Sequence, residues 1–196
     1  MKTRVRKATM TNKERVEALL RRERPDRVPF QPGGRSFAVL HSGGSIPKLF
    51  SGAYTSDWVY QAEKKACRDF DWVLLPAFSP RSDRRSISGA FGGTVKMPSG
   101  KYAQTVSIVR YPAETAEEVM ALKVPDVRTH YTPEMVALCK RICQDNDDNK
   151  PFKISIGALS PVNVAGAIAG VEKLCKWKLQ NPEVAHRILR LATDYN

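Results

Sequence analysis

The residues best suited to chemistry in this sequence lie in the loops that follow three short apolar runs. These loops span residues 31–35, 76–85 and 157–163. The first two loops contain four arginines, which are Arg35, Arg81, Arg84 and Arg85. A guanidinium group can bind a carboxylate or phosphate through two parallel hydrogen bonds, so converging arginines would suit a polycarboxylate or phosphate ligand. The alternative for the arginines of residues 81–85 is an ordinary solvated loop.

Other reactive residues give weaker indications. The usual signatures of nucleotide-binding loops, zinc proteases and serine hydrolases are absent from the sequence. Cys139 and Cys143 are four residues apart on a predicted helix, a spacing that could place two thiolates on one metal ion. Cys139 falls on the apolar side of that helix, however, so we expect Cys139 and also Cys175 to be small buried hydrophobic residues. Among the histidines, only His41, in the loop after the first run, is a candidate for function.

Helices are predicted where a capping residue precedes apolar residues at helical spacing. Thr11 and Glu14 form a reciprocal capping pair for a helix that ends by Pro25, with Val16, Leu19 and Leu20 as its apolar stripe. Further helices are expected over residues 56–70, 164–179 and 182–195, with others starting at Thr115 and near Thr132. Residues 31–47 are predicted to form a loop rich in glycine and serine.

Strands and helices alternate along the sequence, and this pattern favours an α/β protein with a parallel sheet. Core strands are predicted at residues 28–31, 71–76 and 152–157, with an antiparallel hairpin over residues 94–110. A complete (β/α)8 barrel usually needs about 250 residues. We therefore predict the N-terminal part of a TIM-type (β/α)8 barrel with an inserted β-hairpin. Residues 1–9 are expected to be a disordered basic leader, and residues 10–196 to form the barrel portion.

Composition excludes several classes of protein. The 196 residues carry a formal net charge of +12. Half of it lies in residues 1–27, where ten Lys/Arg and four Asp/Glu give +6. No aromatic residue precedes Phe30, so this basic stretch lacks the stacking groups of a nucleic-acid-binding surface and is expected to be a solvated helix face. No apolar run approaches the roughly 20 residues of a membrane span. The four cysteines form no Cys-x-x-Cys pair, which favours reduced thiols and a cytoplasmic protein.

Several segments resemble the uroporphyrinogen decarboxylase superfamily. They are MTNKERVEALLRRERPDRVPF, FDWVLLPAF with the Gly-Gly loop after it, AETAEEVMALKVPD, and above all SIGALSPVNVAGAIAGVEKLCKWKLQNPEVAHRILRLATDY. The resemblance covers residues 10–196 but only the first half or so of a family member. That superfamily includes the decarboxylase of haem synthesis and cobalamin-dependent methyltransferases. The resemblance implies a (β/α)8 barrel, which agrees with the prediction made from the strand and helix pattern.

The decarboxylase motif is only partly present. After its first strand, that enzyme has Arg-Gln-Ala-Gly-Arg, which binds substrate carboxylates; here residues 31–35 read QPGGR, so only Arg35 is retained. Ala77 stands where the resemblance places an aspartate that faces the pyrrole nitrogens. A neutral alanine cannot stabilise developing positive charge, and Asp83 could replace the aspartate only if the loop shifted register. Decarboxylation of a porphyrinogen is therefore disfavoured.

The methyltransferase branch resembles the chain more closely, through PDRVP at residues 25–29. This resemblance implies methyl transfer between a methylcorrinoid and a thiol or folate, with the corrinoid (cobalamin) carried by a partner protein. It also implies zinc, which would activate the thiol and whose ligands we expect beyond Asn196. No catalytic residue is assigned; the predicted substrate-binding residues are Gln31, Arg35, Ser79, Arg81, Ser160 and Asn163.

Two alternatives remain open at this point. One is a decarboxylase or another lyase that acts on a polycarboxylate such as a porphyrinogen, with Arg35 and the arginines of residues 81–85 binding its anionic groups. The other is a non-catalytic half-barrel completed by a partner chain or by a second copy, because an open parallel sheet leaves strand edges and an apolar face unpaired. For an enzyme we expect a small-molecule or corrinoid-protein substrate, and for every hypothesis we expect no nucleic acid or membrane partner.

Overall fold

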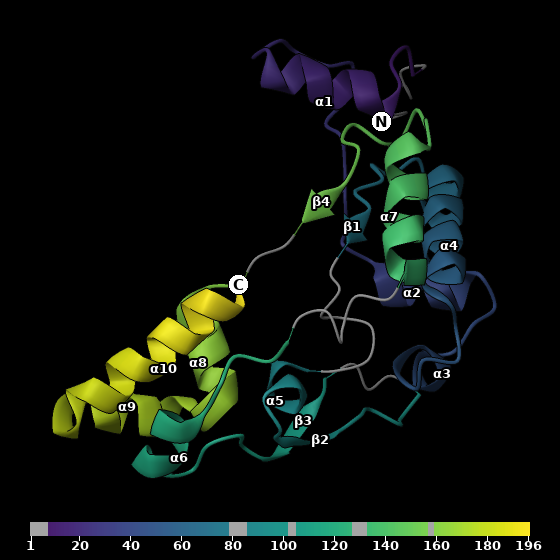
Figure 1. Cartoon of the computed structure of the whole chain (residues 1–196). Helices are drawn as coiled ribbons and strands as arrows, with labels where there is room; N and C mark the ends of the chain where they lie inside the picture. The colour runs from purple at the N-terminus through teal and green to yellow at the C-terminus, as the bar shows by residue number, and fades with distance from the viewer. Residues whose placement is uncertain (1–7, 79–85, 102–104, 127–132, 157–158) are drawn as a thin grey trace, which may run out of the picture. The chain divides into compact units, whose positions relative to one another are not determined.

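The computed structural model describes residues 8–78, 86–101, 105–126, 133–156 and 159–196, and these fall into two compact units (Figure 1). The first unit consists of Met1–Ser45, Tyr54–Phe78 and Pro133–Ile156. The second consists of Ile46–Ala53, Ser79–Thr132 and Gly157–Asn196. Within the described residues, no helix combines the length and the apolar character needed to cross a membrane.

The first unit contains a pair of short parallel strands. Strand β1 (Ala77–Phe78) pairs with β4 (Ser155–Ile156), with Ala77 opposite Ser155. The segment before β1 makes a further backbone hydrogen bond outside the regular strands: the Val73 N–H donates to the Phe30 carbonyl at 2.8 Å. The predicted α/β character with parallel pairing is thus present in this unit.

The strands are shorter than the sequence predicts. Residues 71–76 and 152–154 lie outside regular strands, and residues 28–31 form no strand at all. Prolines explain part of the difference, because Pro29, Pro32 and Pro76 have no N–H to donate to a sheet. The expectation that the third run is buried is also wrong at Phe152, which is 43% exposed.

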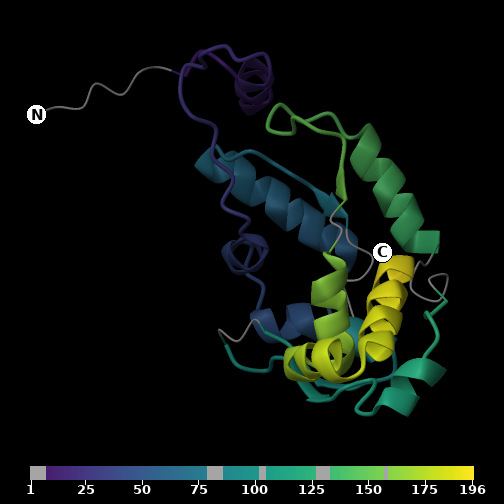
Figure 2. The same ribbon diagram turned by 90° about the vertical axis from the view of Figure 1, so that its left-hand side faces the viewer.

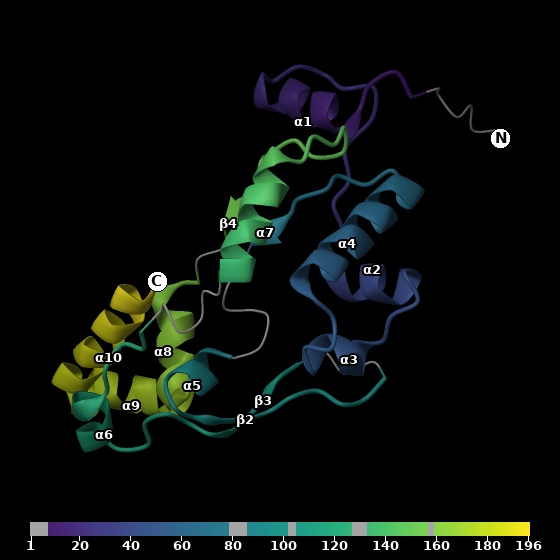
Figure 3. The same cartoon turned by 45° about the vertical axis from the view of Figure 1, so that its right-hand side comes forward.

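The described part of the first unit also contains four helices. They are α1 (Asn12–Leu20), α2 (Arg35–His41), α4 (Ser56–Phe70) and α7 (Pro133–Gln144). Helix α4 has the predicted bounds, and its N-cap Thr55 accepts a hydrogen bond from the Trp58 N–H. Helices α2 and α7 both contact α4, and Figure 1 shows α7 beside it; Figure 3 shows α2 against α4. Helix α2 was not predicted, because Gly and Ser residues on both sides of it indicate a loop.

Helix α1 begins as predicted but buries a different face. The capping box is confirmed, with Thr11 and Glu14 each accepting a backbone hydrogen bond from the other. The predicted apolar stripe is wrong, since Leu19 is 47% and Leu20 66% exposed. The buried residues of α1 include Asn12 and Arg15 instead.

A polar network replaces apolar packing under α1. Arg15 is 1% exposed and donates from Nε to Asp26 Oδ1 at 2.7 Å. Asn12 Nδ2 donates to Asp71 Oδ1 and to Asn149 Oδ1, both at 2.9 Å. Asp26 also accepts the backbone N–H of Thr9 at 2.8 Å. The side-chain hydrogen bond from Arg15, with the backbone donors, holds the pKa of the Asp26 carboxyl well below its usual range.

The second unit contains the predicted hairpin and a group of helices. Strands β2 (Thr94–Lys96) and β3 (Ser107–Arg110) pair antiparallel, which confirms the hairpin. The helices are α3 (Ile46–Phe50), α5 (Ile87–Ala90), α6 (Ala116–Ala121), α8 (Pro161–Ala169), α9 (Val171–Gln180) and α10 (Pro182–Tyr195). Figure 2 shows α8, α9 and α10 gathered together, and their core includes Ile168 and Ile188, which are both fully buried.

The predicted helix over residues 164–179 is in fact two helices. Gly170 lies between α8 and α9 with φ +85°, a backbone conformation that residues with a side chain rarely adopt. Helix α8 also starts earlier than expected, because Ser160 caps it and Pro161 occupies its first turn.

Candidate functional site

The first unit contains a cavity of about 250 Å³ at the start of α2. Two of the predicted site residues, Gln31 and Arg35, line it. The remaining lining residues come from the same segment, from α4 and from the chain before β1: Pro32, Gly33, Gly34, Ala38, Glu63, Ala66, Cys67, Trp72, Val73, Leu74 and Leu75.

The local backbone explains how Arg35 reaches the cavity. Gly33 has φ +64°, and Gly34 then serves as the N-cap, so that Arg35 is the first residue of α2. The positive φ at Gly33 suits glycine, which lacks the Cβ that makes this conformation unfavourable. On the facing surfaces, Ala38 of α2 and Ala66 of α4 are 2% and 1% exposed, and their small side chains let the two helices lie close together.

Arg35 is paired inside the cavity with an acidic residue. Its Nε donates to Glu63 Oε1 of α4 at 3.0 Å, and the two side chains are 30% and 19% exposed. Glu63 was not predicted as a site residue. A signal for it does exist, because Glu63, Ala66 and Cys67 have the i, i+3, i+4 spacing that places three residues on one face of a helix.

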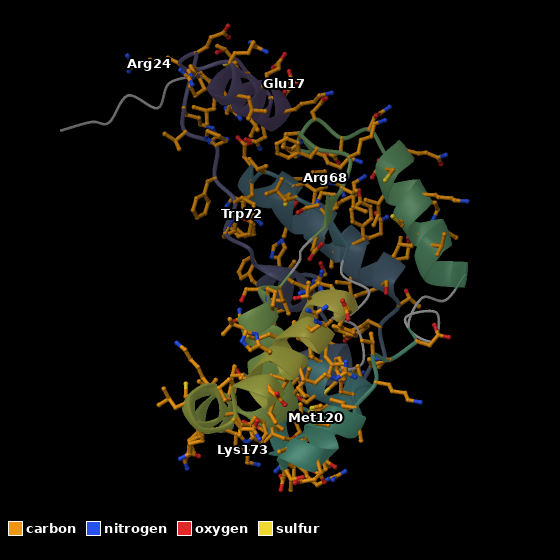
Figure 4. The ribbon with its side chains drawn as sticks, turned by 60° about the vertical axis from the view of Figure 1, so that its left-hand side comes forward. Glu17, Arg24, Arg68, Trp72, Met120 and Lys173 are labelled. Carbon is orange, nitrogen blue, oxygen red and sulfur yellow. The ribbon has the colours of Figure 1, made fainter. Side chains whose placement is uncertain are left out.

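The rest of the cavity wall is largely apolar. Val73 and Leu74 are 4% and 2% exposed, and Trp72 stacks on Phe70 with ring centroids 4.8 Å apart (Trp72 is labelled in Figure 4). Burial raises the pKa of the Cys67 thiol to about 11, and the charge of Glu63 acts in the same direction. Cys67 is therefore a protonated thiol at neutral pH and is poorly suited to act as a nucleophile.

The other predicted binding residues fall elsewhere. Ser79 and Arg81, with Asp83, Arg84 and Arg85, lie outside the described residues. Ser160 and Asn163 belong to the second unit, where the Ser160 Oγ accepts the Asn163 N–H at 3.3 Å and so caps α8. Both are exposed at the start of that helix. It stays a prediction that a shared substrate-binding site includes Ser79, Arg81, Ser160 and Asn163.

His41 lies at the end of α2 with surface partners. Its Nε2 is 2.6 Å from Asp69 Oδ2, and the Lys65 amine is 3.2 Å from the same nitrogen. Its ring stacks on Phe37 with an interplanar angle of 7°. These contacts account for the position of His41, which is not among the residues that line the cavity.

The cysteines provide no metal centre in the described part of the chain. Among those residues, no group of three or more His, Cys, Asp or Glu side chains is arranged to hold a metal ion. Cys139 and Cys143 are half-buried, and Cys175 is exposed, so the expected burial of Cys175 is wrong. The described residues thus do not fit a zinc site, and the expectation of zinc ligands beyond Asn196 stays a prediction.

The chain is similar to known proteins over most of its length. The family model described as uroporphyrinogen decarboxylase (URO-D) matches residues 11–196. No curated protein sequence matches the chain. A solved structure described as a methyltransferase from Methanosarcina mazei is similar, with a TM-score of 0.63 and 17% sequence identity over 95% of this chain and 53% of that chain. At this identity the likeness shows a shared fold, and this chain spans about half the length of that structure.

Proposed function

The chain belongs to the uroporphyrinogen decarboxylase family, and from this premise we propose that it is a methyltransferase-type member acting with a corrinoid. The proposed reaction moves a methyl group between a methylcorrinoid and a thiol or folate acceptor, within a (β/α)8 barrel of which this chain forms part. The observation that carries the proposal is the charge of the cavity. Among the described residues that line it, the one cation, Arg35, already pairs with the one anion, Glu63.

A polycarboxylate substrate would need more positive charge than this pair supplies. Each substrate carboxylate brought into a partly buried cavity requires a cation or several donors to replace its water. Arg35 offers its guanidinium, but the Glu63 carboxylate occupies its Nε at 3.0 Å. The lining that the structure describes therefore favours an uncharged or weakly charged acceptor group over a cluster of carboxylates.

The volume of the cavity favours a small acceptor. Pockets for drug-sized ligands usually measure about 300–1,000 Å³, and this one measures about 250 Å³. A corrin macrocycle does not fit in that space, so the corrinoid would stay on its carrier protein and meet the acceptor at the cavity mouth. When bound there, the corrinoid supplies an electrophilic methyl group.

The residues of this chain would bind and orient the acceptor. Gln31 carries an amide that both donates and accepts hydrogen bonds, and Arg35 presents a guanidinium whose orientation is fixed by Glu63. Trp72 and Leu74 would exclude water from the acceptor. Zinc, where a thiol is the acceptor, would be held by ligands beyond Asn196.

The natural protein that contains these residues can be tested directly. It is incubated without oxygen with methylcobalamin and either dithiothreitol or tetrahydrofolate, and the methylated acceptor is measured by mass spectrometry. We expect product formation in proportion to protein, and a fall of about tenfold or more in Arg35→Gln, because hydrogen bonds to charged groups contribute about 1.5–3 kcal/mol. Arg68→Gln, an exposed arginine on α4, is the matched control and should keep the wild-type rate. No methylated product from either acceptor would contradict the proposal.

A second candidate function is a carboxy-lyase that acts on a porphyrinogen. The observation in its favour is that Arg35, the retained arginine of the decarboxylase motif, does line the cavity. The same preparation, given a porphyrinogen, would then release carbon dioxide and transfer no methyl group.

A further inference from the structure

The ion pair between α2 and α4 places a negative charge inside the cavity. Glu63 is 19% exposed, lines the cavity, and accepts a hydrogen bond from Arg35 at 3.0 Å. Electrostatic interactions between partly buried charges are stronger than between solvated ones, because less water lies between them. Any group that enters the cavity therefore meets both charges of this pair.

The negative charge of Glu63 also acts on Cys67, its neighbour on the same face of α4. Cys67 is one helical turn along α4 and lines the same space. After burial, the charge of Glu63 is the largest cause of the raised pKa of the Cys67 thiol. The formation of a second anion in this cavity, here a thiolate, is thus opposed by Glu63.

We propose that Glu63 is a specificity-determining residue that keeps carboxylates out of this cavity by holding Arg35 and repelling a second anion. The cavity then admits an uncharged hydrogen-bonding group of the acceptor. This inference rests on the proposed function in one respect: both assume that the ligand binds in this cavity. It also accounts for how a chain that retains Arg35 can avoid binding the carboxylates that the same arginine would otherwise attract.

Calorimetric titration with the tricarboxylate tricarballylate tests the proposal. Replacing Glu63 with glutamine keeps its size and removes its charge, so Glu63→Gln should bind tricarballylate about tenfold to a hundredfold more tightly than the wild type, given the usual strength of hydrogen bonds to charged groups. The gain should disappear in the double variant Arg35→Gln/Glu63→Gln. Asp57→Asn removes an exposed negative charge from the same helix and is the matched control; it should leave binding unchanged.

Two results would overturn the proposal. One is binding by Glu63→Gln that is equal to or weaker than that of the wild type. The other is an equal gain in affinity in Asp57→Asn, which would reflect net charge alone.

If Glu63→Gln does not fold, the wild type can still be tested by nitrogen-15 NMR. The readout is the Nε–H signal of Arg35, which is assigned by its loss in Arg35→Gln. That signal should not move with millimolar tricarballylate, and a saturating shift would refute the role of Glu63. A failure of methyl transfer affects none of these binding results, so the two hypotheses fail separately.

Discussion

The hydrogen bond between Tyr60 and Asp145 should measurably stabilise the first unit. The Tyr60 hydroxyl donates to Asp145 Oδ2 at 2.8 Å, and the Tyr60 side chain lies in the core between α4 and α7 with 6% exposure. The Lys64 amine donates to the same carboxylate oxygen at 2.6 Å. Tyr60→Phe removes the hydroxyl and leaves the ring in place, so the variant isolates this one bond.

The expected magnitude follows from the partners that remain. Hydrogen bonds to charged groups contribute about 1.5–3 kcal/mol to stability. In Tyr60→Phe, Asp145 keeps Lys64 and some contact with water, because its side chain is 27% exposed. We therefore expect the free energy of unfolding to fall by an amount at the lower end, about 1.5 kcal/mol.

The effect should also depend on pH. Burial by itself would raise the pKa of Asp145, but the hydrogen bonds from Lys64 and Tyr60 outweigh it and lower the pKa below its ordinary value. A group whose pKa is lowered by folding contributes fully above its unfolded pKa, and the contribution is lost as the pH falls through the folded pKa. The difference between wild type and Tyr60→Phe should therefore shrink below about pH 4, the ordinary range of an aspartate.

Urea unfolding followed by tryptophan fluorescence measures this difference. A Trp177→Phe background leaves Trp58 and Trp72, both in the first unit, as the reporters. Tyr54→Phe is the control, since the Tyr54 hydroxyl accepts a neutral backbone N–H from Ser45 and its loss should show no such pH dependence. A Tyr60→Phe effect within the roughly 0.5 kcal/mol typical of surface substitutions would refute the reasoning.

Two further predictions concern a helix break and the thiols. Gly170→Ala should lower the free energy of unfolding of the second unit by about 1–3 kcal/mol in a denaturation experiment. Alanine is strained at φ +85°, and its Cβ would lie 3.2 Å from the Tyr111 ring. Cys67, with its pKa raised to about 11 by burial, should react with iodoacetamide at mildly alkaline pH far more slowly than exposed Cys175, as peptide mass spectrometry can show. Equal labelling rates would contradict the burial of Cys67.

Local signals in the sequence predicted many of the elements. Thr11 and Thr115 each start a helix with a capping box, and the structure contains both boxes. Helix α10 starts at Pro182, directly after Asn181, as predicted, although Asn181 makes no side-chain capping hydrogen bond there. The two capping boxes could be predicted because a capping interaction joins residues only three positions apart, so the sequence contains both partners side by side.

Predictions failed where the deciding partner is distant along the chain. The face of α1 that is buried depends on Asp71 and Asn149, which lie 59 and 137 residues from Asn12. Apolar periodicity could not identify this face, because the method assumes that a helix packs through its apolar side. The break between α8 and α9 at Gly170 could not be predicted, because a single glycine within a helical pattern can lie either inside a helix or at its end.

Part of the candidate cavity could be anticipated from the sequence. Gln31 and Arg35, which line it, could be selected because they directly follow an apolar run, where loops of parallel α/β proteins contain ligand-binding residues. Glu63 was missed because its role depends on α2, a helix that the Gly-rich and Ser-rich sequence does not indicate. An acidic residue on the same face of a helix as Ala66 and Cys67 is the kind of signal that could have identified it.

The polar network beneath α1 also supports the wall of the cavity. Helix α4 ends at Phe70, and Asp71 follows with φ +52° in the left-handed region, which is uncommon for residues other than glycine but better tolerated by aspartate than by most. Asn12 donates to the Asp71 side chain, and Arg27 donates to its carboxylate and its backbone carbonyl, so these partners hold the turn. The turn leads directly into residues 72–75, which line the cavity. Asn12 therefore helps to set the shape of the cavity although it does not line it, and the buried polar face of α1 serves the site as well as the stability of the unit.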